Sequence, residues 1–281
     1  MLSVCLVLLF GMCTAHRPPA VKLHRRSAVF VAAPSILLAP CFASAEDDGK
    51  LLVVEPTGGQ YSTIAAAVAA APVGAKVLIK SGTYIEQVKI KQSVTLEAEP
   101  GTVLSWFSDK PYEAALTIDL GQSAVAADVL VSGLTIRHAS PSIAQNYAVF
   151  VPQQSREANP SSLVALRDCD VSSSSGSGVG VEGGAVTLDH CRVHDCKNHG
   201  VSFLGRTARG AIRRCSIESN KLNGVLLRDS AAPILEANKL NGNQLYGAAF
   251  IDCRGRYLEG NVAKGNGKGA VSGECDEDDE D

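Results

Sequence analysis

The fold is decided by residues 224–247, which read GVLLRDSAAPILEANKLNGNQLYG and form one unit of a repeat. The units align on an anchor residue that recurs in steps of 22, 24, 23 and 23, at Cys169, Cys191, Cys215, Asn238 and Asn261. An aliphatic residue lies three positions before each anchor, at Leu166, Leu188, Ile212, Leu235 and Leu258. An apolar residue also lies two positions after each anchor, at Val171, Val193, Ile217, Leu240 and Ala263. A period of 20–50 residues is typical of solenoids and arrays.

The spacing inside each unit indicates strands and not helices. Short apolar runs, such as residues 163–166 and 224–227, are bounded by turn residues. About 23 residues suffice for one coil, and coils would stack roughly 4.8 Å apart, so that equivalent side chains form ladders. Asparagine can hydrogen-bond along such a ladder and tolerates left-handed dihedrals. We therefore predict an all-β fold, a single-stranded right-handed parallel β-helix solenoid.

A short helix is expected before the first coils. Ser62 and Thr63 offer hydroxyl caps, and apolar residues follow at helical spacing, at Ile64, Ala67, Val68 and Ala71. A solenoid exposes an apolar cross-section at its end, so this helix is predicted to cap the N-terminal coil.

Outward positions two residues before the anchors carry charges of mostly alternating sign, at Arg167, Asp189, Arg213, Glu236 and Glu259. Such exposed pairs between neighbouring coils contribute a few tenths of a kcal/mol each. We interpret them as solvation of the solenoid and not as a site.

Residues 1–45 predict an export leader. They contain basic residues but no acidic ones, and the apolar run at 4–12 is typical of a secretory signal. Arg25-Arg26, a second apolar run at 28–42 and the triplet Ala43-Ser44-Ala45 are typical of a twin-arginine signal with its cleavage site. Two signals in series resemble the leaders of thylakoid-lumen proteins, so we expect the lumen of a plastid such as a chloroplast. The alternative is secretion by the first signal alone.

The remaining chain divides by composition into a linker at 46–52, a β-helix domain at 53–272 and an acidic, disordered tail at 273–281. With 26 basic and 29 acidic residues, the chain lacks the basic surface of a nucleic-acid-binding protein. We expect a monomer that has no cofactor and, once the leader is cleaved, no membrane span. Cys169, Cys191 and Cys215 are expected to be buried free thiols, and the absence of Cys-x-x-Cys pairs argues against zinc.

Two stretches resemble known families. Residues 61–64, 70–72 and 82–88, the last reading GTYIEQV, are similar to the opening of pectin methylesterase-like β-helices. Residues 224–238 and 258–261 resemble the parallel β-helix repeats of F-box-only proteins and of alginate epimerase-like proteins. The resemblance implies the pectin lyase-like fold. It does not imply one function, because this scaffold hosts lyases, esterases, epimerases and binding domains.

The catalytic motifs of these families are absent from the sequence. Neither the Gln-Asp-Thr-Leu and Asp-Phe-Ile-Phe-Gly motifs of pectin methylesterases nor the Asp-Pro-His-Asp motif of alginate epimerases occurs, and only Asn198-His199-Gly200 approaches a polygalacturonase signature. We therefore expect a non-catalytic scaffold that recognises a protein or a carbohydrate. The alternative is a polysaccharide-modifying lyase, esterase or epimerase.

For that enzymatic alternative, one coil supplies acids and imidazoles as catalytic candidates: Asp189, His190, His194, Asp195 and His199. Such groups can serve as an acid and a base in sugar chemistry. The competing interpretation is that they are turn residues beside the anchors, since solenoid turns favour these residue types.

A second candidate region is the insertion at residues 138–161, which stretches the anchor spacing to 35 residues between Leu134 and Cys169. Insertions in solenoids form loops on one face, often the binding face. Its candidate binding residues are Tyr147, Phe150, Gln153 and Arg156. A loop without function is the alternative.

Overall fold

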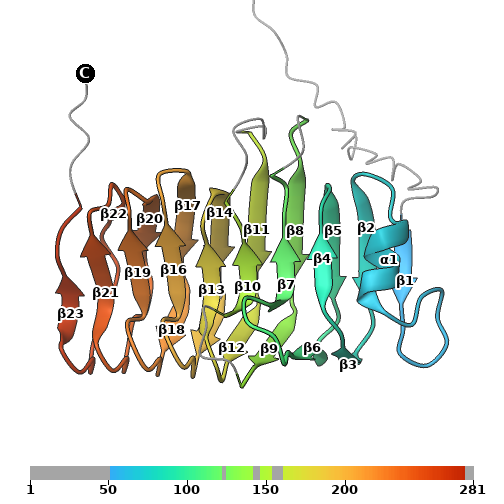
Figure 1. Ribbon diagram of the computed structural model, residues 1–281, viewed down its shortest axis with the longest axis horizontal. Coiled ribbons are helices and arrows are strands. Elements are labelled where there is room, and N and C mark those ends of the chain that lie inside the picture. Colours follow the sequence, from blue (N-terminus) through green and yellow to red (C-terminus); the bar gives the residue numbers. More distant parts are fainter. Residues whose placement is uncertain (1–50, 122–124, 142–145, 154–160, 276–281) are drawn as a thin grey trace, which may run out of the picture. The chain divides into compact units, whose positions relative to one another are not determined.

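Successive coils of the chain contribute strands in turn to three parallel sheets. Figure 1 shows the coils side by side, from α1 (Ile64–Ala70) and β1 (Leu51–Val54) at one end to β23 (Gly269–Ser272) at the other. The predicted all-β parallel β-helix with one short N-terminal helix is confirmed. The computed structural model describes residues 51–121, 125–141, 146–153 and 161–275.

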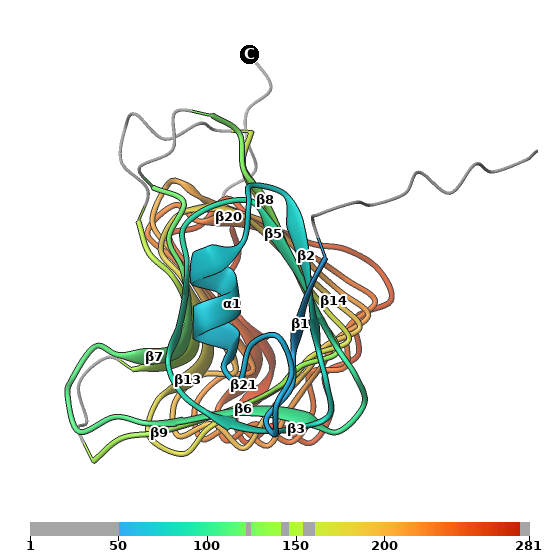
Figure 2. The same cartoon turned by 90° about the vertical axis from the view of Figure 1, so that its right-hand side faces the viewer.

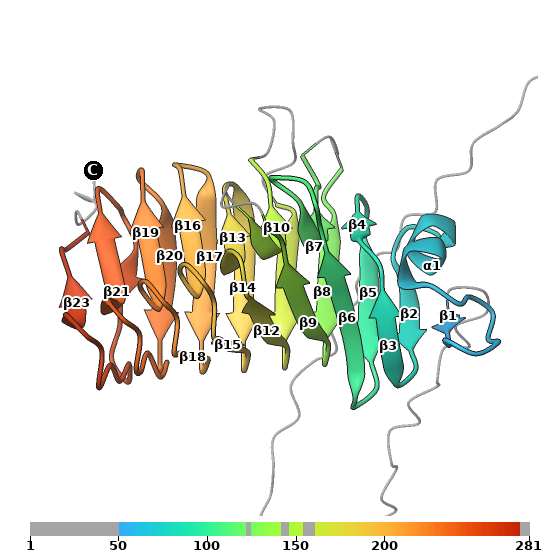
Figure 3. The same ribbon diagram turned by 60° about the horizontal axis from the view of Figure 1, so that its bottom comes forward.

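The sheets line the three sides of the coil, as the view along the stack in Figure 2 shows. Sheet A consists, in spatial order, of β1, β2 (Ala75–Ile79), β5 (Val94–Ala98), β8 (Asp128–Ser132), β11 (Leu163–Arg167), β14 (Gly184–Asp189), β17 (Ala208–Arg213), β20 (Ala232–Glu236) and β22 (Arg256–Tyr257). Sheet B, seen in Figure 3, consists of β3 (Gly82–Ile85), β6 (Thr102–Phe107), β9 (Thr135–Ala139), β12 (Asp170–Ser173), β15 (Arg192–His194) and β18 (Ser216–Glu218). Sheet C consists of β4 (Val88–Ile90), β7 (Ala114–Ile118), β10 (Tyr147–Val151), β13 (Ser177–Val181), β16 (Val201–Leu204), β19 (Val225–Arg228), β21 (Tyr246–Ile251) and β23.

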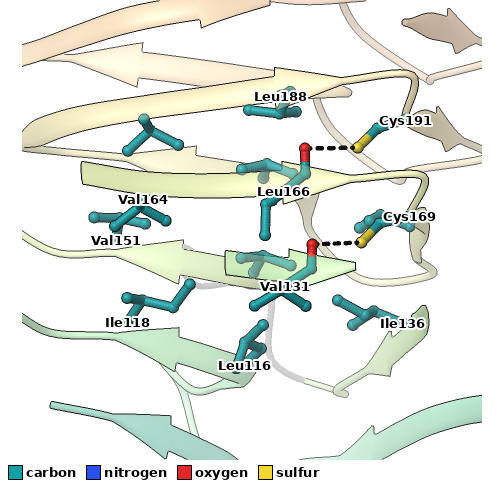
Figure 4. Packing of buried hydrophobic residues seen from close by; sticks show 14 of the residues in the cluster. Leu116, Ile118, Val131, Ile136, Val151, Val164, Leu166, Cys169, Leu188 and Cys191 are labelled. Atoms are coloured by element: carbon teal, nitrogen blue, oxygen red, sulfur yellow. Dashed lines mark hydrogen bonds between the residues drawn. The ribbon is translucent and has the colours of Figure 1, made fainter. Parts of the chain in front are cut away.

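Aliphatic ladders fill the inside of the coil. In sheet A, Leu166 pairs with Val131 of the preceding coil and Leu188 of the next, and all three are at most 1% exposed. Figure 4 shows this stack together with two anchor thiols, where Cys169 Sγ lies 3.5 Å from the Val131 carbonyl oxygen and Cys191 Sγ lies 3.4 Å from that of Leu166. Each fully buried aliphatic side chain stabilises the fold by about 1.5–3 kcal/mol relative to an exposed one.

The predicted anchor ladder is in register and is held by side-chain amides. Asn238 Oδ1 accepts the backbone N–H of Cys215 at 3.0 Å, and Asn238 Nδ2 donates to the carbonyl of Ile212 at 2.8 Å. The residue before each of four anchors has a left-handed φ between 51° and 55°, at Asp168, His190, Arg214 and Ala237. The amide thus satisfies backbone groups that a sharp bend leaves without a sheet partner.

The last coil departs from the predicted register. Leu235 pairs with Tyr257, and not with Leu258 as the repeat predicts. The last coil therefore has one extra residue between its sheet A strand and the Asn261 anchor, and the Leu258 carbonyl accepts a 2.6 Å hydrogen bond from Asn261 Nδ2 there. Tyr257, rather than Leu258, therefore ends the ladder.

The predicted outward charges also meet across coils. Arg213 Nε lies 3.1 Å from Glu236 Oε2, and Arg167 Nε lies 4.0 Å from Asp189 Oδ2. The side chains of Arg213 and Glu236 are each nearly half exposed, so these pairs are weak determinants of stability.

A second buried ladder follows sheet B, and the sequence did not reveal it. It stacks Cys196, Asn220, Asn243 and Asn266, in which each asparagine Oδ1 accepts the backbone N–H of the preceding member at 2.9–3.1 Å. Cys196, which the sequence places outside the anchor ladder, therefore belongs to a ladder of its own. Asp195, Ser219, Gly242 and Gly265, the residues before its members, again have positive φ.

The N-terminal helix caps the first coil as predicted. Its Thr63 side chain accepts the N–H of Ala66 at 3.2 Å, and Ile64 and Ala67 are fully buried. The two carboxylate oxygens of Glu86 accept the N–H groups of Ile64 and Ala65 at 2.7 and 2.8 Å. The Tyr84 hydroxyl donates to the Lys80 carbonyl at 2.9 Å. Within the GTYIE residues that carry the pectin methylesterase resemblance, Glu86 therefore holds this cap in place, and Tyr84 bonds to the neighbouring backbone.

The cysteines that the structure describes fall into two groups. Cys169, Cys191, Cys196 and Cys215 are buried free thiols, as predicted for the three at anchor positions. Cys253 and Cys275 form a disulfide that links the last coils, which the sequence did not indicate. Among the described residues, no helix is long and apolar enough to cross a membrane.

We expect Asn243→Ala to lower the free energy of unfolding by about 2–4 kcal/mol, because it leaves the buried N–H of Asn220 and the carbonyl of Ile217 without partners. Urea unfolding measures the change. The matched control is Asn241→Ala, which removes a 2.9 Å bond to the exposed N–H of Lys264 and should cost less than about 1 kcal/mol. Equal losses in both variants would contradict the structural role of the second ladder.

Glu86→Ala should destabilise the cap by about 1–3 kcal/mol, because it leaves two N–H groups at the start of α1 without acceptors. Glu86→Gln keeps one acceptor oxygen and should therefore lose less stability than Glu86→Ala. Hydrogen exchange of the amides of Ile64 and Ala65 reports the effect locally. Unchanged exchange in Glu86→Ala would refute the capping role.

Candidate functional site

A pocket with a volume of about 160 Å³ lies on the outer side of sheet C. It is lined by Tyr112, Glu113 and Ala114 at the start of β7, by Tyr147 and Phe150 of β10, and by Glu182 after β13. Three successive coils therefore contribute to it, although its residues span 70 positions of the sequence.

Two aromatic rings form one wall of the pocket. The rings of Tyr147 and Phe150 are stacked, with centroids 5.1 Å apart and planes 8° from parallel. A Cβ atom on Gly180 of the next strand would lie 2.3 Å from two carbons of the Tyr147 ring. The absence of a side chain at Gly180 thus leaves the space in which this ring lies.

Backbone contacts place the remaining lining residues. The Glu182 N–H donates to the Val151 carbonyl at 2.9 Å, which fixes Glu182 at the end of β13. The N–H of Tyr112 donates to Asn146 Oδ1 at 3.0 Å, and the side chain of Tyr112 remains 71% exposed. Glu113 accepts a hydrogen bond from the Ser108 hydroxyl.

The carboxyl group of Glu182 is partly buried. Burial raises the pKa of Glu182, and a hydrogen bond with Tyr147 opposes that shift only in part. A carboxylate that is partly desolvated in this way gains from a nearby donor or positive charge.

A buried histidine lies close to Glu113. His138 is 4% exposed, its Nδ1 lies 3.0 Å from Ser173 Oγ, and its Nε2 has no hydrogen-bond partner. Burial lowers its pKa to about 4, although the negative charge of Glu113 opposes the shift. His138 is therefore neutral at pH 7 and is packed as a buried residue of strand β9 in sheet B.

The predicted binding residues are only partly brought together. Tyr147 and Phe150 line the pocket, but they lie on strand β10 and not in a loop, since a full strand of sheet C runs through the insertion at 138–161. Gln153 is exposed and does not line the pocket. Arg156 lies outside the described residues. Tyr112, Glu113 and Glu182 were missed, because the repeat gives no signal for residues that meet only across coils.

The catalytic candidates divide among separate places. Asp189 ends β14, where it meets Arg214 at 2.5 Å and His190 at 3.1 Å. Burial raises the pKa of Asp189, but the Arg214 guanidinium outweighs this and holds it below its usual value. His190 occupies a left-handed turn position with φ 52°. These side chains form an ion-paired group at the bend that follows strand β14 of sheet A.

His194 and Asp195 belong to another group, on sheet B. His194 Nε2 lies 3.0 Å from Asp170 Oδ1, and its Nδ1 lies 2.6 Å from Asp195 Oδ2. Burial raises the pKa of Asp170, but hydrogen bonds from His194 and Arg137 outweigh this and lower it. The carboxylate of Asp170 is thus already engaged by the side chains of Arg137 and His194.

His199 lies apart from both groups, in the bend before β16. Its Nδ1 accepts the N–H of Asn223 at 3.3 Å, and burial lowers its pKa to about 4. The five candidates therefore do not share one cleft. Among the residues that the structure describes, no group of three or more His, Cys, Asp and Glu side chains is placed to hold a metal ion.

Comparison with known proteins agrees with this architecture. Residues 120–277 match the right-handed beta helix region family, and the chain belongs to that family. No protein with a curated description matches the sequence.

Similar solved structures include three proteins of low identity. Pectin methylesterase from carrot is 11% identical, with 83% of this chain and 90% of that one covered at a TM-score of 0.50. The pectin methylesterase of Aspergillus niger is 15% identical, with coverage of 80% and 90% and a TM-score of 0.48. Pectate lyase Pel9A is 12% identical, with coverage of 80% and 78% and a TM-score of 0.49. At this level the likeness concerns the fold alone.

The stability of the domain should decrease as the pH falls from about 6.5 to 4. His138 and His199 are neutral in the folded state, with a pKa of about 4, whereas the unfolded chain binds protons below its ordinary histidine pKa of about 6.5. Protonation therefore favours unfolding in this window, by at most about 1.4 kcal/mol per pH unit for each histidine.

Urea unfolding at half-unit pH steps measures this dependence. The double variant His138→Gln/His199→Gln should flatten the slope between pH 6.5 and 4, while circular dichroism checks that it folds. If the stability of the double variant depends on pH as steeply as that of the unmodified protein, the two histidines are not the groups responsible.

Proposed function

We propose that this protein is a non-catalytic carbohydrate-recognition scaffold and that the sugar binds in the sheet C pocket. The observation that carries this proposal is the stacked pair Tyr147–Phe150 beside Glu113 and Glu182 in one pocket. Aromatic faces pack against apolar ring surfaces, and carboxylate oxygens accept hydrogen bonds from hydroxyl groups. Small-ligand sites commonly combine apolar walls with a few polar groups in this way.

Two features favour binding over catalysis. The carboxylates of Asp170 and Asp189 are engaged by arginines, and His199 is enclosed in a bend. These side chains have structural partners in the solenoid itself. The pocket, in contrast, is lined by aromatic rings and by the carboxyl groups of Glu113 and Glu182.

One observation favours a second candidate, a polysaccharide-modifying enzyme. Glu182, whose pKa burial raises, lies in the same pocket as Glu113, and a pair of carboxyl groups in unlike surroundings can divide acid and base roles. A lyase, esterase or epimerase would use such a pair. Incubation with uronate polymers tests this candidate, because a lyase yields unsaturated products and an esterase releases methanol.

The compartment is part of the proposal. Residues 1–45, which lie outside the described residues, carry the two export signals from which we infer a lumenal or secreted protein. Import of a tagged leader into isolated plastids tests the thylakoid lumen against secretion.

Phe150→Ala should weaken carbohydrate binding about tenfold or more, equal to about 1.4 kcal/mol, because it removes one of the two stacked rings. The probes are neutral, acidic and amine-bearing oligosaccharides, and isothermal titration calorimetry gives the affinities. Phe107→Ala is the matched control, since Phe107 is 63% exposed on sheet B and does not line the pocket. If the unmodified protein, Phe150→Ala and Phe107→Ala bind with equal affinity, the sugar binds outside this pocket or does not bind to the protein.

A further inference from the structure

We propose that the sugar bound in this pocket carries a protonated amine. This inference rests on the proposed carbohydrate-binding function and specifies its ligand as an amino sugar with a free ammonium group. The alternatives that it excludes are a uronate, with a negative charge, and an N-acetylated sugar, with none.

The first argument is the aromatic lining. Three of the six lining residues carry an aromatic ring: Tyr112, Tyr147 and Phe150. An ammonium group over an aromatic face is attracted by the ring quadrupole, by about 0.5–1 kcal/mol at exposed sites and 2 or more when desolvated. The largely exposed ring of Tyr112 and the partly buried ring of Phe150 can both present such a face to a ligand.

The second argument is the charge of the pocket. Among the described residues that line it, Glu113 and Glu182 are the ionisable acids and none is cationic. A uronate would bring its carboxylate toward two carboxylates, and like charges at short range disfavour binding. An ammonium group reverses the sign of that interaction.

The third argument is the partial burial of Glu182. Desolvation disfavours its charged form, and the hydrogen bond with Tyr147 compensates only in part, so its pKa is raised. A bound ammonium group would offset this desolvation by a direct ion pair in a site with less water than the surface. The ligand would thereby lower the pKa of Glu182 toward its ordinary value.

The fourth argument is size. At about 160 Å³, the pocket is smaller than the roughly 300–1,000 Å³ of sites for drug-sized ligands. It therefore suits a single sugar unit or its substituent and not an extended oligomer. A longer chain would place one amine-bearing unit in the pocket and the rest along the flank.

The experiment compares three matched oligosaccharides of equal length by isothermal titration calorimetry at low salt. They are β-1,4-linked glucosamine oligomers, the same oligomers with every amine acetylated, and oligogalacturonate. We expect at least tenfold tighter binding of the free amine than of either other probe. The lysine derivative Nα-acetyl-lysine methylamide tests whether an ammonium group without a sugar suffices.

Two variants test the site, and a third controls for net charge. Glu182→Gln and Glu113→Gln should each weaken binding of the glucosamine oligomer at least tenfold and reduce its preference over the acetylated form. Glu259→Gln changes the net charge equally at an exposed residue outside the pocket and should have no effect. Circular dichroism and the urea midpoint verify the fold of each variant.

The outcomes separate the two levels of the proposal. Tight binding of the acetylated or the uronate probe, with loss in Phe150→Ala, would overturn the amine inference and leave carbohydrate recognition intact. Binding of the lysine derivative as tightly as the amino sugar would indicate a protein ligand and overturn both. If Glu259→Gln loses as much affinity for the glucosamine oligomer as the two pocket variants, the electrostatic attraction is non-specific and the site assignment is overturned. Absence of binding by every oligosaccharide at millimolar concentration would overturn the proposed function itself.

Discussion

The later coils depend on hydrogen bonds that buried side chains make to backbone groups at two of the bends between the sheets. Parallel strands satisfy one another along the sheets, but the chain must turn between them, and a buried bend leaves N–H and C=O groups without partners. Asn238 and Asn243 supply both an acceptor and a donor at these points. Because each amide bonds to the coil before it, the bends also fix the register of the stack. The cysteines in the earlier coils fill the same positions by size and burial, with weaker hydrogen bonds from sulfur.

The requirements of these bends explain why one coil resembles a catalytic constellation. The position before each buried ladder residue has a left-handed φ, which favours glycine, asparagine and aspartate. His190 and Asp195 occupy this position in neighbouring bends of the same coil. Their closeness in sequence follows from the repeat, and their side chains point into separate ion-paired groups. A cluster of acids and histidines in a solenoid sequence is thus an ambiguous signal.

The motif that resembles the pectin methylesterases has a comparable explanation. Glu86 caps α1 and Tyr84 bonds to the backbone, so that the helix closes the apolar end of the stack. A solenoid needs a cap on its terminal coil, and the first N–H groups of a capping helix need acceptors, which Glu86 supplies here. The resemblance therefore reports how the solenoid begins. The pocket on sheet C begins at β7, which pairs with β4 at the end of the motif, but its lining residues lie outside the motif.

The architecture could be read from the sequence alone, because a repeat of nearly constant length specifies which residues stack in all but the last coil. The anchors, the aliphatic ladders and the capping helix all follow from spacing and side-chain type. It also singled out Tyr147 and Phe150, although as parts of a loop. Only the tertiary structure decided that β10 runs through the insertion and that Cys196 begins a second ladder. It alone brought Tyr112, Glu113 and Glu182 together with the aromatic pair. Which residues meet between coils depends on the length and path of each bend. Because the bends differ in length, the spacing of residues along the sequence does not predict these contacts.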